Sequence, residues 1–423
     1  MKRSLLILIM ICFLQLWGNS VFSPQGYPLC TSGNDVYGDG MGGTGIADLY
    51  RINGNMDNPS LMVTSNNVTL STAVNMGYYW YEDVDNRFRD DGIVLPYFKI
   101  TVPMKNHRLG VSLRSLFSGN LDTGGASSAV AGSDTLYYDE INRKTGNIYR
   151  MGLEYAYKNE YLNIGASVLY YLGNDIHYWS LDFEETGYTN SKYEIEKRFS
   201  GMNWNVGVSR KFGNLAIGAS YLPAVKLDGS EYYRYNFSPG TDTLSSETDL
   251  FEIPATINSG VTFLAGKTLK LNCDFRYRFW GNTEITFVNS FSGAEEFYHD
   301  SWRIGGGLSY DPMIGYGKWY ESIPVRGGVS FSKLPFRYKD KDVMELGFSA
   351  GSSLQLSSPG RKLDFAFKYT TRNNGISGDK EDQSFEFSVG ITGIDIFKKS
   401  PKRIAERDIP RVDPGMGVLE DTQ

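Results

Sequence analysis

The feature that most constrains this chain is a strict two-residue alternation of apolar and polar side chains, repeated along much of its length. The clearest case is residues 269–279, which read LKLNCDFRYRF, and similar alternation covers 67–81, 161–173 and 385–391. Successive side chains of a β-strand point to opposite faces. Each segment is therefore predicted to be a strand with one apolar and one polar face.

Strand length and aromatic content favour a membrane barrel over a soluble β-sandwich, which would also alternate but would turn its apolar faces inward. The alternating segments run for roughly ten to fifteen residues, whereas strands of globular proteins average about 5–6. The chain holds 29 Tyr, 24 Phe and 7 Trp, and many of them gather at the ends of these segments. Aromatic residues at strand ends are typical of the two interfaces of a membrane barrel.

The connections between the segments alternate in length. Lys105-Asn106 and Gly266-Lys267 read as tight turns, whereas the polar stretches 121–146, 174–200, 229–249 and 281–299 read as long loops. Short turns on one side and long loops on the other are expected of bacterial outer-membrane barrels. The sequence thus predicts an all-β, transmembrane antiparallel barrel of about 14 strands over residues 67–398. An even strand number would leave both flanking segments in the periplasm.

The N-terminus reads as a secretory signal. Lys2 and Arg3 precede an apolar stretch over 5–17, and small residues follow up to Ser20. This stretch is shorter than the roughly 20 residues that span a bilayer, so residues 1–20 are predicted to be a signal peptide. Export and a barrel together indicate a Gram-negative outer membrane, where lipid surrounds the protein. Whether Cys30 and Cys273 form a disulfide there is left open.

Two segments are expected outside the barrel wall. Residues 21–66 are rich in glycine and precede the first strand, and residues 399–423 form a charged tail with three prolines. The tail is a candidate docking site for a periplasmic protein partner.

The glycine-rich segment carries a resemblance to a known family. It reads YGDGMGGTGIA over 37–47 and continues to NPSL over 58–61. Together with Leu95-Pro96, the IPATI of 253–257 and the PVRGG of 324–328, this order of short motifs resembles the FadL-type transporters of hydrophobic compounds. The resemblance extends over nearly the whole mature chain.

The resemblance implies a fourteen-stranded barrel whose N-terminal segment plugs the lumen as a hatch. It implies passive uptake of hydrophobic small molecules such as long-chain fatty acids, with lateral release beside a kinked third strand, here 107–120. PorV-like barrels, which serve protein secretion or attachment, share the glycine-rich start and are an alternative, as is a general porin. Carried over by position, the hatch would include Gly42, Gly43, Gly45, Asn58 and Pro59.

Other chemistry finds little support in the sequence. A net charge of -6 argues against nucleic-acid binding. The three histidines, His107, His177 and His299, lie at no metal-ligand spacing, and no nucleophile is paired with a base. The sequence therefore predicts neither an enzyme nor a bound metal or cofactor.

Charged residues on the expected inner face are the remaining candidates for a site. Lys270, Arg276 and Arg278 alternate along one wall, and Arg108 and Arg114 are expected to point inward from the third strand. They fit a salt-bridged lumen in contact with the hatch. They also fit a binding wall for an anionic head group, because the arginine fork matches a carboxylate.

Overall fold

The structure is a computed structural model, in which the described residues are 31–82, 87–131, 134–183, 190–237, 240–283, 286–288, 295–312, 323–355, 362–375 and 381–395. The predicted signal peptide (1–20), Cys30 and the predicted tail (399–423) lie outside them. Within the described residues no helix combines the length and apolar character needed to cross a membrane.

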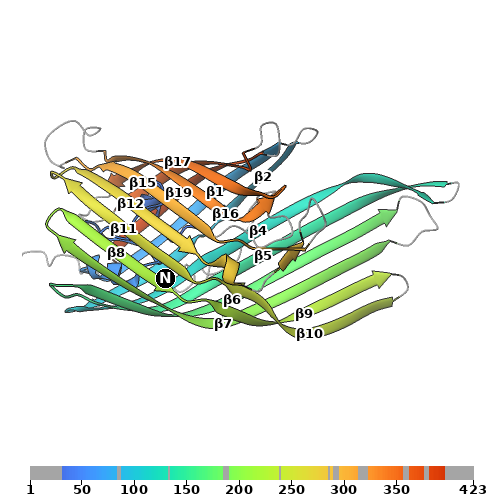
Figure 1. The fold of residues 1–423 in the computed structure, drawn as a ribbon, viewed down its shortest axis with the longest axis horizontal. Coiled ribbons are helices and arrows are strands. Elements are labelled where there is room, and N and C mark those ends of the chain that lie inside the picture. The colour runs from blue at the N-terminus through green and yellow to red at the C-terminus, as the bar shows by residue number, and fades with distance from the viewer. Residues whose placement is uncertain are drawn as a thin grey trace, which may run out of the picture.

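The described strands form a closed antiparallel barrel (Figure 1). The ring closes where the first strand, β1, pairs with the last, β19, over Thr69–Glu82 and Glu381–Asp395. Three barrel strands are each interrupted next to a proline, so that 17 strand segments make 14 barrel strands. The prediction of a transmembrane barrel of about 14 strands is confirmed.

The interrupted strands are β2 with β3, β8 with β9, and β10 with β11, whose breaks fall at Pro96, Pro223 and Pro254. Proline lacks the N–H that a central strand must donate. The strands are β1 (Thr69–Glu82), β2 (Arg87–Val94), β3 (Tyr97–Met104), β4 (His107–Ala131), β5 (Asp134–Tyr157), β6 (Asn163–Phe183), β7 (Ser191–Phe212), β8 (Leu215–Leu222), β9 (Val225–Phe237), β10 (Gly240–Ile253), β11 (Thr256–Ala265), β12 (Leu269–Arg278), β15 (Ser301–Tyr310), β16 (Val325–Tyr338), β17 (Lys341–Gln355), β18 (Lys362–Asn373) and β19 (Glu381–Asp395).

The remaining elements are short. A separate hairpin pairs β13 (Thr286–Val288) with β14 (Glu295–Phe297), next to the 3-10 helix η2 (Trp280–Asn282). The helix α2 (Val36–Asp39) and the 3-10 helix η1 (Pro59–Thr64) precede β1.

The two faces of the wall have opposite polarity, as the alternation predicted. In β12 the side chain of Leu271 is 42% exposed, whereas Lys270 beside it is 3% exposed. Outward positions all around the ring carry large apolar side chains, among them Val111, Leu153, Met202, Val261, Val329 and Phe348. An apolar outer face with a polar lumen is the arrangement of a membrane barrel.

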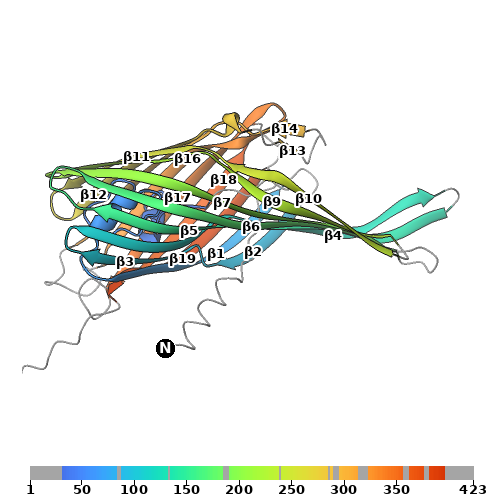
Figure 2. The ribbon, with the colours of Figure 1, turned by 90° about the horizontal axis from the view of Figure 1, so that it is seen from below.

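The long loops expected over 121–146, 174–200 and 229–249 are instead mostly strand, which corrects that prediction. β4 to β7, β9 and β10 continue well beyond the rest of the barrel at one end (Figures 1 and 2). Polar and aromatic pairs across the hairpins hold them, such as Glu194 with Arg234 at 2.7 Å and Tyr193 with Tyr235 at 5.0 Å between ring centres. These strand ends carry polar residues on both faces, so they lack the apolar alternation by which a strand is recognised in a sequence. We call this end the hairpin end and the other the turn end.

Residues 31–66 lie inside the barrel near the turn end and are called here the inner segment (Figure 2). Most of its side chains are buried, including the wholly buried Val36, Met41 and Leu61. It fills the lumen with α2, η1 and turns.

Candidate functional site

The Asn-Pro motif holds the inner segment in place. Asn58 caps η1 by accepting a hydrogen bond from the N–H of Ser60 at 3.2 Å, and Pro59 occupies the first turn of that helix. The side-chain amide of Asn58 also donates to the carbonyl of Ile46 at 2.9 Å. Ser60 is linked to the wall through the hydroxyl of Ser209 at 2.9 Å. The motif therefore joins two parts of the inner segment to each other and to β7.

Glycines let the backbone of the inner segment touch the backbone of the wall. Gly42 and Gly43 have φ of 73° and 67°, which side chains disfavour. On the facing strand β16, a Cβ at Gly328 would lie 2.1 Å from the N of Gly42. Gly45 (φ 151°) donates its N–H to the Asp274 carboxylate at 2.6 Å. Glycine is therefore required on both sides of this contact.

Ion pairs also fasten the inner segment to the wall. Lys270 pairs with Asp48 at 2.9 Å, and Asp48 in turn pairs with Arg51. Arg108 donates to the backbone carbonyl of Ser65 at 2.6 Å. Lys270 and Arg108 are thus occupied in contacts with the inner segment.

A cluster of arginines surrounds Asp57, the residue before the Asn-Pro motif. Arg114 of β4 donates to its Oδ1 at 2.6 Å, and Arg276 of β12 donates to its Oδ2. Arg150 of β5 lies 3.6 Å from Oδ1 and donates to the carbonyl of Met56 at 2.9 Å. Three wall strands therefore direct guanidinium groups at one buried carboxylate of the inner segment.

The positive charge of the arginine cluster lowers the pKa of Asp57. Burial alone would raise the pKa of this carboxyl, but Arg114, Arg276, Arg150 and Arg278 hold it well below its usual range. Asp57 is consequently ionised under all physiological conditions. Several cations around one anion leave a local excess of positive charge.

A small cavity lies between these arginines and an apolar wall. Its polar side is formed by Asp57, Arg114, Arg150, Asn205, Arg276 and Arg278, and its apolar side by Leu116, Phe117, Leu222, Ile253 and Trp280. The cavity measures about 30 Å³, enough for about two waters. Ligand pockets are commonly about 300–1,000 Å³. The site is therefore amphipathic and small.

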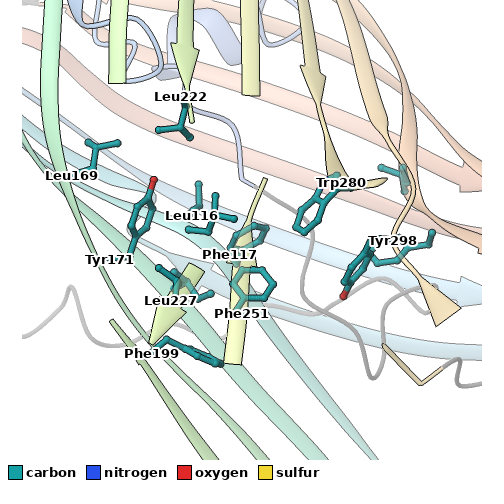
Figure 3. Close-up of a cluster of buried hydrophobic side chains, with 14 of the residues drawn as sticks. Leu116, Phe117, Leu169, Tyr171, Phe199, Leu222, Leu227, Phe251, Trp280 and Tyr298 are labelled. Atoms are coloured by element: carbon teal, nitrogen blue, oxygen red, sulfur yellow. The ribbon is translucent and has the colours of Figure 1, made fainter. Parts of the chain in front are cut away.

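The apolar wall belongs to a larger cluster of buried side chains in the lumen, which lies between the inner segment and the hairpin end (Figure 3). Phe117 meets Phe251 edge to face at 5.7 Å between ring centres, and Trp280 lies 5.0 Å from Tyr298. The buried members are Leu116, Phe117, Ile148, Leu169, Tyr171, Phe199, Leu222, Leu227, Phe251, Ile253, Trp280, Tyr298, Leu334, Phe336, Tyr338 and Val343.

Some of these side chains point inward because their strands are irregular. The register of β4 shifts by one residue between Ser115 and Phe117, and that of β10 between Asp249 and Phe251. A one-residue shift moves the following side chains to the opposite face. Others, such as Leu334 and Phe336 of β16, lie on the same face as the polar Ser330 and Ser332, so the regular alternation already turns them inward.

The wall is incomplete between the second and third barrel strands. β3 pairs with β4 only as far as Tyr97 with Arg114, and β2 pairs with β1. No pairing among the described residues joins β2 to the remainder of β4, whose other edge pairs with β5. Thr31 donates its N–H to the carbonyl of Leu116 at 2.9 Å at this open edge. The ladder between the second and third barrel strands is therefore interrupted at the level of the apolar cluster.

The predicted site residues are thus divided between two places. Arg114, Arg276 and Arg278 meet at the cavity, whereas Lys270 and Arg108 lie nearer the turn end. Sequence reasoning missed Asp57 and Arg150. The position of Asp57 next to Asn58-Pro59 was a usable signal, because a charge within a buried segment needs an opposite charge.

A second cavity lies outside this site. A cavity of about 510 Å³ opens near the turn end between the inner segment and the wall, with Tyr50, Lys158 and Lys211 among its lining residues. It lies away from the arginine cluster. No group of three or more His, Cys, Asp or Glu side chains suited to a metal occurs among the described residues.

The fold is that of FadL-type channels. A Pseudomonas aeruginosa FadL homologue has a TM-score of 0.61 at 12% identity, covering 86% of this chain and 99% of its own. The toluene transporters TbuX of Ralstonia pickettii (0.56, 15%, 85% and 98%) and TodX of Pseudomonas putida (0.56, 14%, 86% and 98%) are also similar. The predicted resemblance is confirmed at the level of the fold.

The sequence itself matches a family model. No protein among those with curated functions matches the chain. The family model named BamG matches residues 1–399, which include the whole described barrel. The chain belongs to the BamG family.

Proposed function

We propose that this protein is an outer-membrane channel for passive uptake of hydrophobic compounds that carry a carboxylate, such as long-chain fatty acids. The observation that carries this proposal is the cavity with arginines on one side and an aromatic and aliphatic wall on the other. Arginine binds a carboxylate through two parallel hydrogen bonds. An alkyl chain attached to that carboxylate would lie against Phe117, Leu222 and Trp280.

The fold supports a channel role. Structures with this fold include a FadL homologue and two toluene transporters, as their names state. The two toluene transporters carry a hydrophobic cargo that has no charged head group. In this chain the arginines around Asp57 favour an acid over a neutral hydrocarbon.

The route follows from two features of the wall and the lumen. The inner segment acts as a hatch, because it occupies the lumen near the turn end. The gap between β2 and β4 provides lateral release into the membrane, because it begins beside the apolar cluster. In this proposal a compound that reaches the arginines lies next to the hatch and next to the opening between β2 and β4.

The first experiment is mass spectrometry of lipids extracted from the purified folded barrel, beside a mock purification. Enrichment of fatty acids is expected. Uptake of labelled hexadecanoate by cells that carry Arg276→Ala/Arg278→Ala should then fall at least tenfold relative to the unaltered barrel, by the loss of charge-assisted hydrogen bonds worth about 1.5–3 kcal/mol each.

Arg372→Ala is the matched control, because it also removes a buried arginine of the wall, but one that pairs with the wall residues Glu345 and Asp382 and lies away from the cavity. Its uptake should stay near that of the unaltered protein. Unchanged uptake in a folded Arg276→Ala/Arg278→Ala barrel contradicts the carboxylate assignment. Uptake of toluene but not of hexadecanoate by the unaltered protein also contradicts it.

A further inference from the structure

The head-group site is already occupied by a carboxylate that belongs to the chain itself. Both oxygens of Asp57 are bound, Oδ1 by Arg114 and Oδ2 by Arg276. A fatty acid presents the same chemical group with the same two acceptor oxygens. We infer that Asp57 is an internal competitor, and that a ligand binds by exchanging its own carboxylate for that of Asp57. The inference rests on the proposed function.

The size of the cavity requires such an exchange. A space of about 30 Å³ cannot hold a head group with its first methylenes, because pockets for small ligands are about ten times larger. Something must therefore leave before a ligand can reach the arginines. Among the lining groups, Asp57 is the acid that Arg114, Arg150 and Arg276 contact.

The charges make the exchange conditional on an anion. Arg114 is 2% exposed and Arg150 is 4% exposed. Moving Asp57 away without a replacement would deprive these buried guanidinium groups of their shared counter-ion, which costs several kcal/mol for a buried pair. A carboxylate that replaces a carboxylate leaves the net charge of the site unchanged. A neutral hydrophobic molecule of the same length cannot make this exchange.

The surroundings of Asp57 allow its side chain to move while its neighbours stay in place. Asn58 and Ser60 are fastened separately to Ile46 and Ser209, and the backbone carbonyl of Asp57 accepts from Asn205 at 3.0 Å. The exchange is therefore local, and it does not require the whole inner segment to leave the lumen.

Competition by a tethered group lowers the apparent affinity for the ligand in proportion to the effective concentration of that group. Removing the competing charge should therefore tighten the binding of a carboxylate and of nothing else. Asp57→Asn keeps the shape of the side chain and removes its charge. Asp48→Asn is the matched control, because it neutralises another buried acid of the inner segment that pairs with Lys270 instead of with the cluster.

The test is a binding titration of hexadecanoate and of hexadecanol with the unaltered full chain and both variants, folded in detergent. Hexadecanoate should bind Asp57→Asn at least tenfold more tightly than the unaltered protein. Hexadecanol should show no difference, and Asp48→Asn should leave the ratio of the two ligands unchanged. Hexadecanoate that binds the unaltered protein and Asp57→Asn equally well overturns the inference and leaves the proposed function standing. An unaltered protein that binds neither ligand overturns both.

A second measurement uses the unaltered protein alone, so that the result does not depend on whether Asp57→Asn folds. Hydrogen exchange of peptides that cover residues 53–57 should accelerate when hexadecanoate is added, because Asp57 loses its arginine contacts, whereas exchange at the fastened residues Asn58 and Ser60 should not change. Hexadecanol should not produce this change. Equal exchange with and without bound hexadecanoate overturns the inference.

Discussion

The lumen has a polar half toward the turn end and an apolar half toward the hairpin end, and the strands that line the two halves differ. Toward the turn end the strands are regular, their inward residues are polar, and ion pairs and backbone contacts hold the inner segment. Toward the hairpin end the strands are broken or shifted in register, and their inward residues form the apolar cluster. The difference teaches that the inward face of one strand can be polar toward one end and apolar toward the other, as Ser330 and Phe336 of β16 are. A one-residue shift, as at Phe117 of β4, adds further apolar side chains to the lumen.

Breaking the polar half should have the largest effect. Lys99 and Glu154 form a buried pair at 2.9 Å, and Lys99 also donates to the carbonyl of Asn55 in the inner segment. Lys99→Met leaves the carboxylate buried without this cation and should cost about 3–5 kcal/mol of unfolding free energy. Urea unfolding in lipid vesicles measures it. The double variant Lys99→Met/Glu154→Met should recover a large part of the loss, and a double variant as unstable as the single one would contradict this account.

Breaking the apolar half should cost slightly less. Leu227 is wholly buried in the cluster, and Leu227→Ala should lower the free energy of unfolding by about 2–4 kcal/mol through lost burial and a residual cavity. Leu308→Ala, on the outer face, is the control and should change it far less. Hydrogen exchange at residues 58–60 should stay unchanged in Leu227→Ala, since the polar half holds them. Faster exchange there would show that the two halves are not independent.

The contact between the two backbones offers a sharper test of the polar half. Gly328→Leu places a side chain where the N of Gly42 lies, so the inner segment must shift, at a cost of about 1–3 kcal/mol. Single-barrel conductance in planar bilayers should rise as the lumen opens. Gly306→Leu is matched, because a Cβ there meets nothing within 4 Å. Equal conductance of the two variants would argue against a close contact at Gly328.

The smallest expected effect concerns pH. Burial raises the pKa of Asp39 to about 7, and the hydrogen bond from Ser32 and the charge of Lys368 offset only part of this rise. The folded protein therefore keeps this proton up to about pH 7, whereas the unfolded chain releases it near its usual value of 3.8. Stability from this group is complete below about pH 4 and is lost as the pH rises toward 7.

Asp39→Asn should accordingly flatten the pH dependence. Between pH 6 and pH 8 the unaltered protein should lose on the order of 1 kcal/mol more unfolding free energy than the variant. Parallel urea titrations at the two pH values measure the difference. Identical pH dependence in both proteins would show that Asp39 is not buried in its neutral form.

Regular alternation made the polar half predictable from sequence. It identified the inward positions of Lys270 and Arg276, and the even strand number followed from closure. The apolar half was not predictable to the same extent, because nothing in the local sequence marks the register shift that turns Phe117 inward. Strand segments outside the apolar zone, such as the start of β2 at Arg87, were also hidden, because polar residues on both faces remove the alternation.

Arg114 illustrates the limit for the candidate site. Its inward direction followed from the strand period, but its partners Asp57 and Thr31 come from a segment that has no period at all. Contacts between a wall and an irregular segment depend on tertiary packing, which spacing along one strand does not encode.

The seam between β1 and β19 has a consequence for how such a molecule is assembled. β1 directly follows the inner segment, and β19 is the last described strand, so the ladder that completes the ring joins the two chain ends of the barrel. This pairing has the greatest loop-closure entropy to overcome. Closure of the barrel by β1 and β19 therefore also encloses the inner segment. Because the inner segment is synthesised before the barrel strands, it is present when this last pairing forms.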